Sequence, residues 1–314
     1  MLKLGILIDA SAEVPPEILA DPRVHLLPIK VQIDESSLFD RRDPATTRDF
    51  NSQYLNLRSA QVSYSVPPDE ESIREFFLTH ISADFDHVFG LFVTSTRSPI
   101  FESAFAAASK AISDSLPLRL AKGVKGPLFV ECYDSLNMSS GYGVQVMEVL
   151  RQFDLNPSAA NLRSQVNELN RKAYAYVAPS QLDFILTRAK AKGEKSVGML
   201  GAAAAKMLGV LPVVRCQVGE TEVVGKFRGA AASQQFVLNV ARRELQRGLL
   251  APFVNLSYSG PVADVQAMPS YRSLVQEAST RGVKVSLYET SPTMSINFGP
   301  NTLSGFRVWT DEVK

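Results

Sequence analysis

The sequence predicts an α/β protein with two domains: an N-terminal domain with a largely parallel, helix-covered sheet, and a C-terminal mixed α/β domain. In the first half, short apolar runs alternate with segments of helical spacing, which is typical of strand–helix–strand units. In the second half, two consecutive apolar runs flank Gly219-Glu220, and this pattern indicates a hairpin and therefore antiparallel pairing. A chain of 314 residues is long enough for both domains.

The first domain begins with an apolar run at residues 4–8, whose length and flanks favour a buried strand. A short helix is expected next, with Ser11 as its N-cap, and residues 35–66 are predicted to form a loop with a helix near 46–56. Ser98 is expected to cap a later helix, with Pro99 as its first residue. The remaining expectations are one or two strands over 24–33, strands at 88–93 and 128–132, and helices at 12–20, 71–81, 99–115 and 139–153.

A linker is expected at residues 154–160, which contain Asn156-Pro157 and small side chains. The domains are therefore assigned to residues 1–156 and 157–314. Within the second domain, strands are predicted at 174–178, 211–218, 222–227, 252–258, 284–288 and 295–298, and helices at 158–171, 180–192, 199–209, 233–248 and 269–281. The hairpin among these strands implies a mixed sheet.

Charge and composition narrow the classes of function. The net charge of +1 gives no reason to expect a nucleic-acid partner. Cys132 and Cys216 are predicted to be reduced thiols, as in a reducing cytoplasm. Asp9 interrupts the first apolar run, so no secretory signal is expected, and the apolar runs are too short for stable membrane insertion. We therefore expect a cytoplasmic protein.

Short polar motifs follow the predicted strands of the first domain. Because ligands of open α/β sheets bind beyond the carboxyl ends of the strands, and helix N-termini favour anions, these motifs predict a site for a small anionic group. Taken singly, each motif is also explained as a helix cap or a turn, and for Asp9-Ala10-Ser11 that explanation is the better one. The motifs are Asp9-Ala10-Ser11, Thr94-Ser95-Thr96-Arg97-Ser98-Pro99 and Asp134-Ser135, with Ser65-Val66-Pro67 and Gly299-Pro300 elsewhere in the chain.

Motifs for bond-breaking chemistry are absent from the sequence. No nucleophile elbow, Walker loop, dinucleotide fingerprint or zincin motif is found, and His25, His80 and His87 lack metal-ligand spacing. Asp9 and Asp134 could together hold a magnesium ion, which keeps a metal-dependent small-molecule enzyme open as an alternative. Our leading expectation is a protein without catalytic residues, cofactor or metal.

In order and spacing, the polar motifs resemble those of the DegV family over nearly the whole chain. Leu182-Asp183-Phe184 and Leu211-Pro212-Val213 also resemble segments of that family's second domain. The resemblance implies a two-domain α/β fold that holds a long-chain fatty acid between its domains. It further implies that the carboxylate is presented to a separate ATP-dependent fatty acid kinase subunit. Ser95 falls where the family has a carboxylate-binding serine.

Several positions depart from the family pattern, among them Pro99 and Ile100, which replace a glycine and a threonine of the serine-rich turn, and three others bear on the head group. Tyr64 replaces a ligand-touching threonine, and Asn297 replaces a histidine that helps to hold the carboxylate. Arg97 replaces a leucine of the serine-rich turn. Since asparagine offers only neutral donors, Arg97 is expected to restore the positive charge. The expected ligand-binding set is Asp9, Ser11, Tyr64, Ser65, Thr94, Ser95, Thr96, Arg97, Ser98, Asn297 and Gly299.

The acyl chain requires an apolar tunnel, for which the second-domain helices are the candidates, including Met199, Leu200, Met207 and Leu208. Ordinary core packing explains the same residues equally well. Besides the fatty-acid carrier and the metal-dependent enzyme, a third interpretation stays open: a degenerate member of the family that binds another apolar ligand. The replaced histidine favours this third interpretation.

Overall fold

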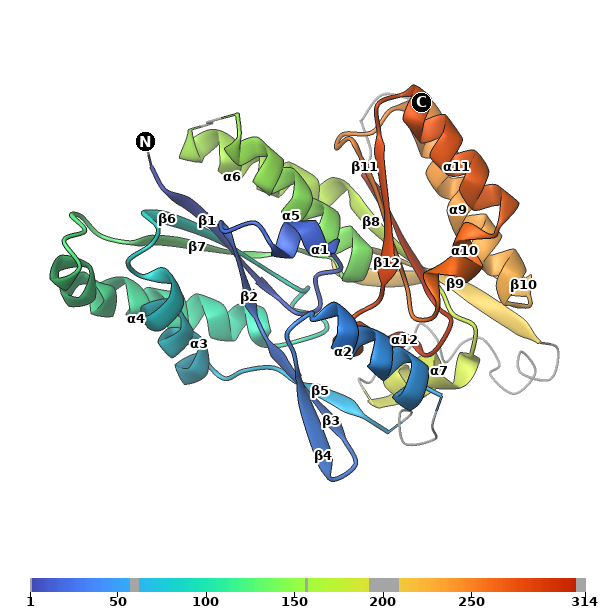
Figure 1. The fold of residues 1–314 in the computed structure, drawn as a ribbon, viewed down its shortest axis with the longest axis horizontal. Helices are drawn as coiled ribbons and strands as arrows, with labels where there is room; N and C mark the ends of the chain where they lie inside the picture. The colour runs from blue at the N-terminus through green and yellow to red at the C-terminus, as the bar shows by residue number, and fades with distance from the viewer. Residues whose placement is uncertain (1, 57–61, 156–157, 192–208, 309–314) are drawn as a thin grey trace.

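The computed structural model describes residues 2–56, 62–155, 158–191 and 209–308, and Figure 1 shows how its strands and helices are arranged. The first sheet has four parallel strands in the order β2-β1-β6-β7. Its central strands β1 and β6 are almost wholly buried, as expected of parallel strands covered on both faces. The bounds are Leu4–Asp9 for β1, Val24–Leu27 for β2, His87–Phe92 for β6 and Phe129–Asp134 for β7.

Helices follow the strands of this sheet as the alternating pattern predicts. α3 and α4 pack against each other, and α4 packs on β6 and β7. The side chain of Asp69 caps α3 by accepting a hydrogen bond from Ser72 N at 2.8 Å. The bounds are Pro16–Leu19 for α1, Glu70–Phe76 for α3, Phe77–Ile81 for the π-helix η3, Ile100–Ala121 for α4 and Ser139–Phe153 for α5.

The second sheet has six strands in the order β10-β9-β8-β13-β11-β12, and it is mixed because only β11 and β12 pair in parallel. The predicted hairpin joins β9 and β10. Val218 and Gly219 both have positive φ there, as a tight two-residue turn requires. The strands are β8 Ala173–Ala178, β9 Val210–Gln217, β10 Glu220–Arg228, β11 Phe253–Tyr258, β12 Lys284–Glu289 and β13 Leu303–Val308. The helices are α6 Ala159–Lys172, α7 Leu182–Ala191, α9 Ala230–Arg247, α10 Val262–Gln266, α11 Pro269–Thr280 and α12 Pro292–Phe298.

A third, small antiparallel sheet has the order β4-β3-β5, and its β3–β4 hairpin extends away from the two larger sheets (Figure 1). Its strands are β3 Ile29–Ile33, β4 Ser36–Asp40 and β5 Tyr64–Val66, and α2 Pro44–Asp49 with the π-helix η1 Phe50–Tyr54 lies between β4 and β5 in the chain. β3 confirms a predicted strand within 24–33, and α2 with η1 confirms the helix expected near 46–56. The sequence prediction placed β4 and β5 in a loop. β4 and β5 are mostly exposed, so they lack the apolar alternation that marks a strand.

Several predicted elements are wrong in type or position. Residues 295–298 form part of helix α12, not a strand, because Ser291 caps a helix with Pro292 at its first turn. β13 and α10 were not predicted. The first helix is only Pro16–Leu19 with Pro15 as its N-cap, and Ser11 instead hydrogen-bonds Asp9. Pro99, not Ser98, is the N-cap of α4.

Two expectations fall on residues that the structure does not describe. The domain boundary at 156/157 lies outside the described residues, so the assignment of domains to 1–156 and 157–314 stays a prediction. Most of the expected helix at 199–209 lies outside them as well, and with it the proposed tunnel residues Met199, Leu200, Met207 and Leu208.

Helix α5 joins the two large sheets. It packs against β1 of the first sheet and against β8, β11 and β13 of the second, and Figure 1 shows it between their strands. Almost every residue of α5 is buried, and the hydrophobic core runs continuously through it. Gly143 allows the closest approach, because a Cβ atom there would lie 1.6 Å from the carbonyl oxygen of Glu13. Asn255 Nδ2 donates to the same oxygen at 2.7 Å.

The substitution Gly143→Ala tests this close approach, because two opposing effects predict opposite signs for the change in the free energy of unfolding. Helix propensity alone predicts a gain of about 1 kcal/mol in the free energy of unfolding. The contact with a backbone oxygen predicts a loss of about 3 kcal/mol or more. We expect the loss, measured by urea unfolding. The control Gly126→Ala meets no atom within 4 Å and has φ of +88°, so backbone strain alone should cost it about 1–2 kcal/mol. A stabilised Gly143→Ala protein would refute the close packing.

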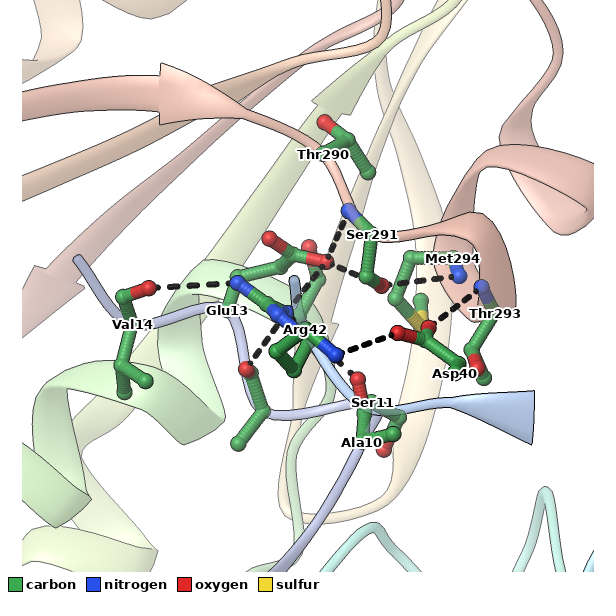
Figure 2. A network of polar contacts seen from close by, with 12 residues as sticks. Ala10, Ser11, Glu13, Val14, Asp40, Arg42, Thr290, Ser291, Thr293 and Met294 are labelled. Atoms are coloured by element: carbon green, nitrogen blue, oxygen red, sulfur yellow. Dashed lines mark hydrogen bonds and ion pairs between the residues drawn. The ribbon is translucent and has the colours of Figure 1, made fainter. Parts of the chain in front are cut away.

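A buried ionic cluster connects the small sheet to both larger ones (Figure 2). Arg42 is buried, and its guanidinium donates to the carbonyl oxygens of Ala12 at 2.8 Å and Val14 at 3.1 Å. It also pairs with Glu13 Oε1 at 3.1 Å. Glu13 Oε1 in turn accepts hydrogen bonds from the backbone N and the hydroxyl of Ser291. The loop after β1 is thereby tied to the start of α12.

Asp40 completes this cluster. It accepts hydrogen bonds from Arg42 N at 3.0 Å and from Thr293 N at 2.9 Å. Burial raises the pKa of Asp40 and of Glu13, and the charge of Arg42 acts against that rise. Two buried carboxylates thus depend on one guanidinium for compensation. Removing one member of such a cluster is far more costly than the cluster's net contribution to stability.

Arg42→Met is therefore expected to lower the free energy of unfolding by about 3–5 kcal/mol, because it leaves Glu13 and Asp40 without a cation. Denaturant unfolding measures this loss. The neighbouring Arg41 is exposed and provides the matched control, since Arg41→Met should change stability by less than about 0.5 kcal/mol. Equal stabilities for the two variants would show that the cluster does not hold the three sheets together.

Candidate functional site

The three sheets meet around a cavity of about 230 Å³ at the carboxyl ends of the first sheet's strands. One water molecule needs only about 10–15 Å³ by the same measure, so this space is large enough for a larger ligand. Its wall is mostly apolar with a few polar groups, which is typical of small-molecule sites. The lining residues are Ser11, Ile29, Ser65, Pro67, Val93, Arg97, Ser98, Pro99, Met138, Val177, Ile185, Val214, Thr221, Thr293, Met294, Asn297 and Phe298.

Ser11 follows the first strand and lines the cavity. Its position is set by hydrogen bonds to the buried Asp9, which ends that strand. The Asp9 carboxylate accepts hydrogen bonds from Ser11 N at 2.8 Å, from the Ser11 hydroxyl, and from Val93 N at 2.9 Å. Burial raises the pKa of Asp9, and these hydrogen bonds act against the rise. Asp9 is not among the lining residues. It connects the ends of β1 and β6 and so positions Ser11 and Val93.

Arg97 lies in the cavity wall beside the β9–β10 hairpin. Its Nη2 atom donates to Thr221 Oγ1 at 2.7 Å. Burial lowers the pKa of Arg97, and nearby Cys216 and Glu220 act in the opposite direction. An arginine keeps its charge under such conditions, so a cation stands in an otherwise mainly apolar wall.

Thr94 and Thr96 contact the tip of this hairpin and are not among the lining residues. Thr96 Oγ1 donates to Gly219 O at 2.7 Å, and it lies 3.3 Å from Thr94 Oγ1. Gly219 N donates to Leu136 O at 2.7 Å. The turn after β6 therefore holds the second sheet against the first, and this contact brings Arg97 to Thr221.

Ser95 is directed toward Asp134. Its backbone N and its hydroxyl both donate to Asp134 Oδ2, at 3.1 and 2.6 Å. Because a hydroxyl has one hydrogen to donate, Ser95 has none left for a carboxylate in this arrangement. Asp134 also accepts from Leu136 N at 2.7 Å. Within the described residues, no group of three or more His, Cys, Asp or Glu is arranged to hold a metal ion.

The remaining predicted residues differ in their placement. Ser65 and Ser98 line the cavity, whereas Tyr64 is 55% exposed and does not, since successive side chains of β5 point to opposite faces. Asn297 lines it, and its Nδ2 atom donates to Thr293 O at 2.7 Å. Gly299 ends α12 with φ of +86°. A Cβ atom there would lie 2.8 Å from the ring of Phe184, so Gly299 has a packing role.

Five of the expected residues therefore come together in the cavity wall: Ser11, Ser65, Arg97, Ser98 and Asn297. Whether they bind a ligand stays a prediction. The sequence analysis missed Thr221, Thr293 and Met294, which come from β10 and α12. The start of α12 was recognisable from Ser291-Pro292, an N-cap residue followed by proline.

No helix among the described residues has the length and apolar character needed to cross a membrane. A family model described as "Uncharacterised protein, DegV family" matches residues 3–308. Two DegV domain-containing proteins, from Xanthomonas axonopodis pv. citri and Xanthomonas campestris pv. campestris, are each 32% identical to the chain over 303 residues. The match covers 96% of both chains in each case.

Solved structures share the fold. A fatty-acid-binding DegV family protein from Thermus thermophilus superimposes with a TM-score of 0.73 at 18% identity, covering 98% of this chain and 100% of that one. DegV of Bacillus subtilis, described as a fatty acid binding protein, gives 0.73 at 14% identity with the same coverage. A stearic acid-binding protein from Eubacterium ventriosum gives 0.72 at 20% identity, covering 98% of both chains. The mixed α/β architecture and the family match agree with the sequence motifs, and the chain belongs to the DegV family.

Proposed function

We propose that this protein is a non-enzymatic carrier that binds a long-chain fatty acid in the cavity between its sheets. The observation that carries the proposal is a mainly apolar cavity at the carboxyl ends of the parallel strands with the cation of Arg97 in its wall. An acyl chain gains about 0.8 kcal/mol for each buried methylene, so the apolar wall supplies most of the affinity. The solved relatives described as binding fatty acids support this choice of ligand.

The carboxylate is proposed to lie near Arg97, with Ser11, Ser65, Ser98 and Asn297 as neutral partners. A guanidinium can make two parallel, charge-assisted hydrogen bonds to a carboxylate, and such bonds are about twice as strong as neutral ones. In this chain an arginine on the turn after β6 takes the role that the family gives to a histidine at the position of Asn297. This exchange moves the positive charge to another part of the wall.

A separate ATP-dependent fatty acid kinase subunit is the proposed partner. Phosphoryl transfer to a bound acid needs a nucleotide site and metal ligands, and the sequence has no Walker loop or other nucleotide motif. The proposal therefore assigns that chemistry to the partner and only presentation of the carboxylate to this chain. It also places the protein in the cytoplasm, where ATP is available.

A second candidate, binding of a different apolar ligand, is favoured by two contacts. The Ser95 hydroxyl already donates to Asp134, and Asn297 Nδ2 already donates to Thr293 O. Both residues occupy positions that the family resemblance assigns to the carboxylate. If their internal hydrogen bonds persist, the head group must bind without them. A neutral lipid would then suit the cavity better than an acid.

The first experiment is native mass spectrometry of the purified protein, followed by denaturation and extraction for lipid analysis. We expect a stoichiometric adduct with the mass of a fatty acid, or uptake of added fatty acid by the lipid-free protein. A stoichiometric neutral lipid would favour the second candidate. Protein that neither carries nor takes up any fatty acid would contradict the carrier proposal.

Arg97→Ala is expected to weaken fatty acid binding at least tenfold, because a hydrogen bond to a charged group is worth about 1.5–3 kcal/mol. Displacement of a fluorescent fatty acid measures the affinity. Arg74→Ala is the control: Arg74 forms ion pairs with Glu71 and Asp114 and does not line the cavity, so its loss should leave affinity unchanged. Equal affinities for the two variants would exclude Arg97 as the head-group residue.

A further inference from the structure

The β9–β10 hairpin of the second sheet reaches the cation in the cavity wall. Arg97 Nη2 donates to Thr221 Oγ1 at 2.7 Å, and both residues line the cavity. The direction of this bond is fixed, because a guanidinium has only donors and the hydroxyl oxygen must accept. A residue of the second sheet therefore orients the side chain of Arg97, although Arg97 itself follows a strand of the first sheet.

Thr221 stands in a fixed place relative to Arg97. At the tip of the hairpin, Gly219 N donates to Leu136 O and Gly219 O accepts from Thr96 Oγ1, each at 2.7 Å. Thr221 comes two residues after Gly219 and pairs with Cys216 across the hairpin. Its side chain is also stiff about χ1 because its Cβ is branched. The acceptor for Arg97 is thus held against the same turn that carries Arg97.

A long side chain such as arginine needs a partner of this kind to keep one orientation. Arg97 is only half-buried, so packing does not enclose the whole side chain. Ordering a flexible side chain at the moment of binding lowers affinity, and ordering it beforehand avoids that loss. A hydroxyl is neutral, so Thr221 can orient the guanidinium without repelling an anionic ligand.

We propose that Thr221 is a positioning residue that holds the guanidinium of Arg97 in place for the carboxylate of the ligand. The inference rests on the proposed function, in which Arg97 binds the head group. Because Thr221 acts through Arg97, its contribution requires both the arginine and an anionic head group. A threonine that only supported the hairpin would affect acidic and neutral ligands alike.

The experiment measures the affinities of wild type, Thr221→Val and Thr221→Ser for palmitic acid and for hexadecanol, by displacement of a fluorescent fatty acid. Thr221→Val replaces only the hydroxyl, by a methyl group, and valine suits a strand, so the variant is expected to fold. We expect it to bind the acid about fivefold more weakly than wild type, because the guanidinium must then be ordered on binding. Its affinity for the neutral alcohol should change less than about twofold, as should the affinity of Thr221→Ser for the acid.

The same substitution is also made together with Arg97→Ala. In that background Thr221→Val should change affinity for the acid less than about twofold, so the two substitutions should not be additive. Thr280→Val is the matched control. Thr280 Oγ1 donates to Glu277 O at 2.8 Å, and Thr280 does not line the cavity, so this variant should bind the acid as wild type does.

The possible failures differ in their pattern. Wild-type affinity of Thr221→Val for the acid would overturn the positioning role and leave the carrier function standing. Equal losses for acid and alcohol, or an equal loss with and without Arg97, would overturn it in favour of support for the hairpin. A wild-type protein that binds no palmitic acid would overturn the carrier function and this inference together.

Discussion

The guanidinium of Arg42 is the interaction on which the arrangement of the cavity depends. It donates to carbonyl oxygens of the loop after β1, and its carboxylate partners Glu13 and Asp40 bind the start of α12. Since Asp40 ends β4, the small sheet is held in the same cluster. Three walls of the cavity are thus positioned by one buried group of charges. Hydrophobic contact alone is not directional and would not fix these walls relative to one another.

The parallel sheet and its helices could be predicted because β1, β6 and β7 contain short apolar runs and the helices between them have apolar residues at helical spacing. The small sheet could not, because β4 and β5 are mostly exposed and take their shape from pairing with β3. Residues 294–298 alternate between apolar and polar side chains, as a strand does. The cap of Ser291 with Pro292 determined a helix instead. Here the N-cap signal at the start of the helix determines the structure, and the short alternation of apolar and polar side chains does not.

In the candidate site, too, some features could be predicted from the sequence and others could not. Sequence order placed several polar residues at strand ends, and Ser11, Ser65 and Arg97 do meet at the cavity. It could not show which partner each side chain takes. Ser95 and Asp134 satisfy one another, and Thr96 binds the hairpin tip. Hydroxyl groups accept whichever partner the tertiary fold brings near, so their orientation depends on contacts between residues far apart in the chain.

Under the proposed function, the division of the cavity wall into apolar and polar parts explains how the fold can tolerate a changed head-group site. Affinity grows with the number of buried methylenes, at about 0.8 kcal/mol each, and this term does not depend on whether position 297 is histidine or asparagine. The polar atoms decide instead which end of the ligand is bound and which chemical class is accepted. Arg97 and Asn297 come from different elements, the turn after β6 and helix α12. Under the proposed function, placing the charge at Arg97 and not at position 297 changes where the head group lies, while the apolar contacts that supply most of the affinity remain.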